Sequence, residues 1–202
     1  MKEEGALIIF QKKPESGKVK TRLAKTIGNK KAVEVYDYLL KHTHQQVARL
    51  DIAVFVYFER EVQPEFLLKR KYYGSLQSNG NLGNRMKNAF DEVMGKGYQS
   101  VLIIGTDCLE ISPDLLRKAL QALESNDLVI GPAHDGGYYL LGMNKLHPTL
   151  FEGMNWSTPT VFDDTMKAAA ELGLKVEVLQ RLSDIDVYED MGKELKRELG
   201  IL

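Results

Sequence analysis

The sequence lacks two features of proteins that lie outside the cell or in a membrane, since it has few cysteines and no long apolar run near its start. Its 202 residues include one cysteine, Cys108, which excludes a framework of internal disulfide bonds and fits a reducing compartment. The longest apolar run near the start, residues 6–10, is too short for a secretory signal or a membrane span. We therefore expect a cytoplasmic protein without a membrane span.

Neither sign of charge is in excess. Lys and Arg number 27 against 28 Asp and Glu, for a net charge of −1, so the overall charge gives no reason to expect nucleic acid as a partner.

The motifs of several enzyme classes are also missing. Gly17-Lys18 is followed by Val19 and not by the Ser or Thr of a Walker A loop. Neither a nucleophile elbow nor a Cys/His spacing for zinc occurs.

What is present is the pattern of an α/β protein. We expect one domain over residues 1–202, because no repeat, linker or low-complexity tract interrupts the chain. Apolar runs and helical periodicity predict strands at 7–10, 52–58, 101–104, 128–130, 139–141 and 176–179, and helices at 32–50, 82–94, 113–123, from 158 onward, and at 188–199. This alternation predicts a three-layer fold, a mainly parallel sheet with helices on both faces. The short link at Asp135-Gly-Gly137 predicts a local antiparallel excursion.

The segment after the first predicted strand is strongly basic. It carries Lys12, Lys13, Lys18, Lys20 and Arg22 against a single Glu15. A glycine-bearing loop that feeds a helix N-terminus presents backbone N–H groups to an anion, and cationic side chains add charge-assisted hydrogen bonds. The segment therefore predicts a phosphate-binding loop. A solvated basic surface loop is the alternative.

Acidic residues follow three later strands, where ligands collect in open α/β sheets. Asp107 is placed to hold a cation that bridges phosphates, or to bond the backbone of its own turn. Asp135 precedes two glycines that permit close approach of backbone to a ligand, or simply caps a tight turn. Asp184 and Asp186 offer a further pair of carboxylates. Asp186 and Glu189 also have capping-box spacing, which would make Asp186 an N-cap.

Taken in order, these segments resemble a bacterial and archaeal family of glycosyltransferase-A-type transferases, described as nucleotide-diphospho-sugar transferase-like and selenodomain-associated. More distantly, the chain is similar to the 2-phospho-lactate and molybdenum-cofactor guanylyltransferases. The motifs that carry the resemblance span nearly the whole chain: Phe10-x-Lys12-x-Pro14-x-x-Gly17-x-Val19-Lys20-Thr21-Arg22-Leu23, Leu82-Gly83-x-Arg85-Met86, Gly105-Thr106-Asp107-Cys108, Gly131-Pro132-Ala133-x-Asp135-Gly136-Gly137-Tyr138-Tyr139-Leu140, Trp156-Ser157-Thr158 and Asp184-Ile185-Asp186-x-x-Glu189-Asp190.

The resemblance implies a Rossmann-like nucleotide-binding fold, a role in catalysis for Lys20, Arg22 and Asp107, and Mg²⁺ or Mn²⁺ as cofactor. It implies metal ligation by Asp107 and Asp186, with help from Asp184 left open. Nucleotide contacts are implied for Lys12, Gly17, Lys20, Arg22, Asn81, Gly83 and Arg85. An acceptor pocket is implied for Asp135, Gly136, Gly137, Tyr138, Trp156 and Thr158.

The sequence departs from the family pattern at two places. Asn81 stands where related sequences have an aspartate, and Val187-Tyr188 replaces Thr-Pro after Asp186. The second departure favours a capping role for Asp186.

We expect a Mg²⁺-dependent transferase that binds a nucleoside triphosphate or nucleotide sugar and a small-molecule acceptor. No further carboxylate is assignable as a base for an acceptor hydroxyl, which favours nucleotidyl transfer to an anionic acceptor. A nucleotide-sugar-dependent glycosyltransferase and a non-catalytic nucleotide-binding module are the alternatives. The oligomeric state is not predictable from the sequence.

Overall fold

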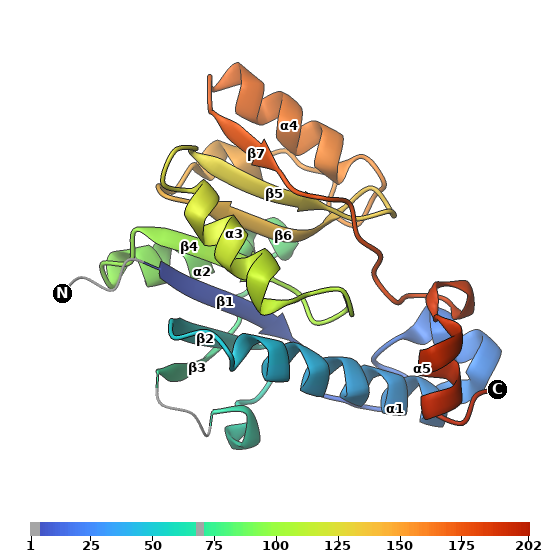
Figure 1. The fold of residues 1–202 in the computed structure, drawn as a ribbon. Coiled ribbons are helices and arrows are strands. Elements are labelled where there is room, and N and C mark those ends of the chain that lie inside the picture. The colour runs from blue at the N-terminus through green and yellow to red at the C-terminus, as the bar shows by residue number, and fades with distance from the viewer. Residues whose placement is uncertain (1–4, 68–70) are drawn as a thin grey trace.

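The fold is a seven-stranded sheet between two layers of helices, seen in a computed structural model that describes residues 5–67 and 71–202 (Figure 1). The strand order is β3-β2-β1-β4-β6-β5-β7. All paired neighbours run parallel except at β6, which is antiparallel to both β4 and β5. The strands are β1 (Gly5–Gln11), β2 (Ala53–Phe58), β3 (Tyr72–Leu76), β4 (Ser100–Ile104), β5 (Leu128–Pro132), β6 (Tyr138–Met143) and β7 (Val176–Val178).

Helices cover both faces of the sheet. The C-terminal end of α1 and the whole of α3 pack on one face, and α2 and α4 pack on the other. Figure 1 shows α3 in front of the sheet and α2 behind it. The helices are α1 (Thr21–Val47), α2 (Leu82–Gly95), α3 (Pro113–Ala122), α4 (Val161–Glu171) and α5 (Lys193–Glu198). The predicted three-layer α/β fold and its antiparallel excursion are thus confirmed.

Several element boundaries differ from the prediction. The first helix begins at Thr21 and not at residue 32, because its polar opening turns carry little apolar periodicity; Gly28, with φ of 80°, interrupts it. The helix expected from residue 158 begins at Val161, after Ser157 with φ of 65°. Edge strand β3 was not predicted, since most of its side chains lie in partial or full contact with solvent.

The predicted helix at 188–199 is two short elements. A 3₁₀ turn spans Tyr188–Asp190, Met191 is extended, and α5 begins only at Lys193. Further 3₁₀ turns lie at Pro64–Phe66 and Pro148–Phe151. Within the described ranges, no helix combines the length and apolar character that crossing a bilayer requires.

The strand directions bring the segments after β1, β4 and β5 to one edge of the sheet. β1 and β4 are parallel neighbours, so the segments after Gln11 and Ile104 leave the sheet side by side. Chain connections from β1 and β4 diverge here to opposite halves of the sheet, which makes this the topological switch point where open α/β sheets bind ligands. β6 is antiparallel to both β4 and β5, so β5 ends and β6 begins at this edge, and the turn between them lies there as well.

A half-buried histidine lies close to this edge. His44 of α1 packs against the Phe66 ring at 4.6 Å between centroids, and its Nε2 lies 2.7 Å from Oε1 of Gln11. Gln11 in turn donates from Nε2 to Oε1 of Gln63 at 3.0 Å. Burial lowers the pKa of His44 to about 4, so its ring is neutral near pH 7.

This histidine should make the fold sensitive to acid. The ordinary pKa is 6.5, so between pH 6.5 and about 4 the unfolded chain holds a proton at this site that the folded protein excludes. The contribution of the neutral ring to the free energy of unfolding is therefore fully present above pH 6.5. It decreases as the pH falls, by about 1–2 kcal/mol between pH 7 and 5. His44→Gln should lack this part of the decline in urea unfolding at the two pH values. The same pH dependence in both proteins would contradict the assignment, since carboxyl contributions are common to both.

Candidate functional site

A cleft of about 700 Å³ opens at the switch-point edge of the sheet. Its volume lies in the range of small-molecule sites. The segments after β1 and β4, the β5–β6 turn, the start of α2 and the segment after β7 all contribute to its walls. The lining includes these predicted residues: Lys12, Lys20, Arg22, Arg85, Asp107, Asp135, Gly137, Tyr138, Trp156, Thr158 and Asp186.

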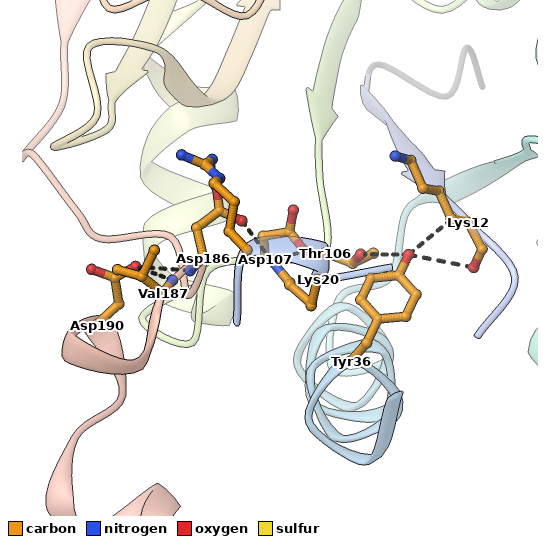
Figure 2. A network of polar contacts seen from close by, with 9 residues as sticks. Lys12, Lys20, Tyr36, Thr106, Asp107, Asp186, Val187 and Asp190 are labelled. Atoms are coloured by element: carbon orange, nitrogen blue, oxygen red, sulfur yellow. Dashed lines mark hydrogen bonds and ion pairs between the residues drawn. The ribbon is translucent and has the colours of Figure 1, made fainter. Parts of the chain in front are cut away.

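At the centre of the cleft, Lys20 joins two acidic segments (Figure 2). Its ammonium Nζ lies 2.8 Å from Oδ1 of Asp107 and 3.1 Å from Oδ1 of Asp186. The Lys20 side chain is 3% exposed, although the residue stands at the N-cap of α1 with φ of 47°. Arg22 pairs with Oδ2 of Asp186 from the solvent side, where its side chain is 63% exposed. The basic loop and the carboxylates therefore meet in one place.

The charges in the cleft keep Lys20 protonated and disfavour ionisation of one carboxyl group. Burial alone would lower the pKa of Lys20, but the negative charges of Asp107 and Asp186 outweigh it and the pKa is raised. Burial, and after it the charges of Asp107 and Asp135, raises the pKa of the Asp184 carboxyl to about 7. The cleft therefore holds more acidic groups than its buried cation can balance.

Backbone contacts fix the acidic segment after β7 beside the end of β4. The N–H of Ile185 donates to the carbonyl of Asp107 at 2.9 Å, and Cys108 and Asp184 form an isolated β-bridge. The capping hypothesis for Asp186 is wrong: the carboxylate of Asp190 accepts the backbone N–H groups of Asp186 and Val187, each at 2.8 Å. The Asp186 side chain is thereby left to face Lys20 and Arg22.

Tyr36 links the two strand-end loops that hold the charged groups. Its Oη accepts from the N–H of Lys12 at 2.9 Å, donates to the carbonyl of Lys12 at 3.3 Å, and lies 3.4 Å from the donating Oγ1 of Thr106. Burial raises the pKa of this phenol well above its usual range. Sequence reasoning missed Tyr36 because it falls in the apolar stripe of a predicted helix, where a tyrosine is typical of a core.

The basic loop is only partly directed at the cleft. Lys12 and Lys18 line it, whereas Lys13 pairs with Glu61 away from the lining. Gly17, with φ of 75°, supplies a positive-φ turn but does not line the cleft. Four basic residues of the predicted phosphate-binding loop therefore line the cleft: Lys12, Lys18, Lys20 and Arg22. Lys13 lies at the surface, as the alternative hypothesis describes.

On the α2 side, Arg85 is oriented by a fixed glutamine. Gln77 donates from Nε2 to the carbonyls of Tyr57 at 3.1 Å and Gln11 at 3.4 Å, and its Oε1 accepts from Arg85 at 2.8 Å. Gln77 went unrecognised because it follows the unpredicted strand β3. Asn81 caps α2 by accepting from the N–H of Asn84 at 2.9 Å.

Three further predicted binding residues do not line the cleft: Asn81, Gly83 and Gly136. Asn81 lines a shallower neighbouring hollow that it shares with Trp156 and Thr158. Gly83 and Gly136 permit close packing instead: a Cβ at Gly83 would lie 2.4 Å from Nε1 of Trp156, and one at Gly136 would lie 1.9 Å from the carbonyl oxygen of Pro159. The two glycines therefore shape the cleft wall without forming its surface.

The wall opposite the basic loop is built on the β5–β6 turn. Asp135 accepts from the N–H of Gly137 at 2.9 Å, so the turn-capping hypothesis is confirmed, and the residue also lines the cleft. The Tyr138 hydroxyl and the Trp156 indole nitrogen are buried without a hydrogen-bond partner in the part of the chain that the structure describes.

The donor set of the cleft fits a hard divalent cation. Oδ1 of Asp107 contacts the Lys20 ammonium at 2.8 Å, and Asp186 presents carboxylate oxygen on the other side of Lys20. Mg²⁺ takes one or two protein carboxylates and completes its shell with water and phosphate. Over the same residues, no three His, Cys, Asp or Glu side chains form a ready-made cage.

The contact between Gly83 and Trp156 gives a test of how the cleft wall is built. We expect the added methyl group in Gly83→Ala to displace the Trp156 indole and to lower the free energy of unfolding by about 1–3 kcal/mol. The fluorescence of this single tryptophan should shift to longer wavelength. Gly95→Ala in the same helix is the matched control, because a Cβ there meets nothing within 4 Å. Emission and urea midpoint that match the control would contradict this packing.

Comparisons with known proteins agree with this fold. The chain superimposes with a TM-score of 0.86 and 31% identity on a protein of Desulfovibrio desulfuricans G20 provisionally described as a nucleotide-diphospho-sugar transferase, covering 96% of this chain and 91% of that one. A nucleotidyl transferase from Methanothermobacter thermautotrophicus matches with a TM-score of 0.60 and 13% identity, over 98% and 99% of the two chains.

CMP:2-keto-3-deoxy-manno-octonic acid synthetase, solved in complex with CTP, matches with a TM-score of 0.60 and 9% identity, over 98% of this chain and all of that one (100%). No curated protein matches the sequence. The model of the family described as uncharacterized protein conserved in bacteria, DUF2064, matches residues 40–158. The chain therefore belongs to the DUF2064 family and has the fold of the nucleotide-diphospho-sugar transferases.

Proposed function

We propose that this protein is a nucleotidyltransferase that binds a nucleoside triphosphate with Mg²⁺ and transfers the nucleotidyl group to a small anionic acceptor. The observation that carries the proposal is the meeting of Lys20, Asp107 and Asp186 in one cleft at the switch point of the sheet. This combination supplies cations for a polyphosphate and oxygen ligands for a divalent ion in the same place.

The phosphates would bind where α1 begins. Lys12, Lys18, Lys20 and Arg22 line this side of the cleft, and the first turn of α1 contains no acidic residue. The free N–H groups and positive dipole end of a helix favour an anion at that position. Tyr36 would hold the Lys12 backbone in a fixed position relative to the loop that carries Asp107, because its hydroxyl bonds to both segments.

Asp107 and Asp186 would hold the metal ion. When bound, Mg²⁺ supplies charge neutralisation on the phosphate oxygens and lowers the energy of the transition state. Lys20 and Arg22 would orient the phosphates so that an acceptor oxygen attacks the α-phosphorus in line. The new O–P bond forms as the bond to the bridging oxygen breaks, and pyrophosphate leaves with that electron pair.

No covalent nucleophile is needed for this transfer. The Cys108 thiol lines the cleft, but burial raises its pKa to about 12, which keeps it protonated and unreactive. The nucleoside would lie toward Arg85, with Asn81 and Gly83 shaping the wall behind it. The acceptor would lie toward Asp135, Gly137, Tyr138, Trp156 and Thr158, with Gly136 holding the turn against Pro159.

Glycosyl transfer from a nucleotide sugar is a second candidate, favoured by the description of the Desulfovibrio relative. The same residues would then hold a departing nucleoside diphosphate while the sugar moves to the acceptor. The two reactions release different products, which separates them without knowledge of the acceptor: pyrophosphate in nucleotidyl transfer and a nucleoside diphosphate in glycosyl transfer.

The proposed function is tested by thermal unfolding of the protein with each common nucleoside triphosphate and nucleotide sugar, with and without Mg²⁺. A ligand at one hundred times its Kd stabilises by about 2.7 kcal/mol. Positive pairs are then assayed for release of pyrophosphate and of nucleoside diphosphate in mixtures of phosphorylated and hydroxylated acceptors. Pyrophosphate release supports the proposal, nucleoside diphosphate release supports the second candidate, and Mg²⁺-dependent binding without either product indicates a non-catalytic module.

Asp107 gives the sharpest single substitution. Asp107→Asn keeps the shape of the side chain but removes the charge, so we expect it to abolish the Mg²⁺-dependent part of the nucleotide stabilisation. Asp51→Asn is the matched control, because Asp51 is 96% exposed and lines neither hollow described above. An Asp107→Asn protein with unchanged Mg²⁺-dependent nucleotide affinity would leave the metal assignment without support.

A further inference from the structure

The Lys20 ammonium stands where a divalent ion shared by Asp107 and Asp186 would have to be. It lies 2.8 Å from one carboxylate oxygen and 3.1 Å from the other, in a side chain that is 3% exposed. An ion bound at the roughly 2.1 Å distances of Mg²⁺–oxygen bonds would contact the same two oxygens from the same space. The two cations therefore exclude one another at this point.

We propose that Lys20 is the residue that controls access of the divalent ion: its ammonium fills the cation position until a polyphosphate draws it away. The divalent ion then binds together with the polyphosphate and only weakly before it. This inference rests on the proposed function, and it assigns to Lys20 an order of binding that the proposed function alone does not require.

The balance of charge supports this order. With the cleft empty, the carboxylates of Asp107 and Asp186 face the cations of Lys20 and Arg22, so an added divalent ion meets a pair of sites that is already neutralised. A triphosphate brings about four negative charges and competes for both cations. The two carboxylates are then left without partners, and the divalent ion is the group that restores the balance.

The chain allows Lys20 to make this exchange. The ammonium is carried on a flexible four-carbon stem, so it can turn from the carboxylates to a phosphate by rotation of the side chain alone. Its backbone is fixed at the N-cap of α1, where the free N–H groups would bind the same phosphate. Arg22 needs a smaller change, because it already lies on the solvent side of Asp186.

The test measures binding of Mn²⁺ alone to the full chain, without nucleotide, from the electron paramagnetic resonance signal of free Mn²⁺. We expect weak binding by the unaltered protein and at least tenfold tighter binding by Lys20→Met, which keeps the apolar stem and removes the charge. Lys25→Met removes the same charge from an exposed position one turn further along α1 and should leave Mn²⁺ affinity unchanged.

Two further measurements tie the result to this site. Asp107→Asn in the Lys20→Met background should abolish the gain in Mn²⁺ affinity. Inorganic tripolyphosphate should tighten Mn²⁺ binding by the unaltered protein much more than by Lys20→Met. Lys20→Gln answers the same questions if circular dichroism shows that the methionine variant is unfolded.

Folded Lys20 variants that bind Mn²⁺ no more tightly than the unaltered protein would overturn the inference, and so would a gain that Lys25→Met shares. These outcomes are separable from those of the proposed function. Mg²⁺-dependent nucleotide binding with no effect of Lys20 on Mn²⁺ alone would leave the function standing without the inference. Tighter Mn²⁺ binding by Lys20→Met with no nucleotide binding at all would uphold the cation exclusion and overturn the function.

Discussion

The ion pairs of Lys20 with Asp107 and Asp186 are the contacts on which the rest of the site depends. They join the loop before α1, the end of β4 and the segment after β7 around one buried ammonium group. A buried ammonium group is costly unless its charge has a partner. The carboxylates of Asp107 and Asp186 meet this condition for Lys20, and Arg22 shares Asp186 with it.

The topology of the sheet explains why these groups meet. Parallel β1 and β4 send their following loops to the same edge, and the reversal at β6 returns the β5–β6 turn to it. β7 is parallel to β5 and ends at the same edge, and the segment after it is held beside β4 by the hydrogen bond from the N–H of Ile185 to the carbonyl of Asp107. The same arrangement leaves a basic wall on one side of the cleft, and on the other a wall of aromatic and small residues around Tyr138 and Trp156.

Much of the fold could be predicted from the sequence, because buried strands such as 101–104 are continuous apolar runs and Ser112-Pro113 marks the start of α3. Exposed edge strand β3 and the polar opening of α1 carry no such signal. The sequence predicted which segments of the chain contribute to the candidate site, but not which of their side chains contact one another. The sequence does not show whether Asp186 or Asp190 caps the following turn, because this depends on the path of the backbone. Tyr36 has the spacing of a core residue, and only the structure shows the hydrogen bond between its hydroxyl and the backbone of Lys12.

The most direct test of the account is a crystal structure of the protein with Mn²⁺ and a nucleoside triphosphate that stabilises it, with the ion located by its anomalous scattering. The account predicts a manganese peak between the carboxylates of Asp107 and Asp186, with phosphate oxygens at Lys20 and Arg22. A peak elsewhere, or a triphosphate bound while Lys20 still bridges the two carboxylates, would contradict it.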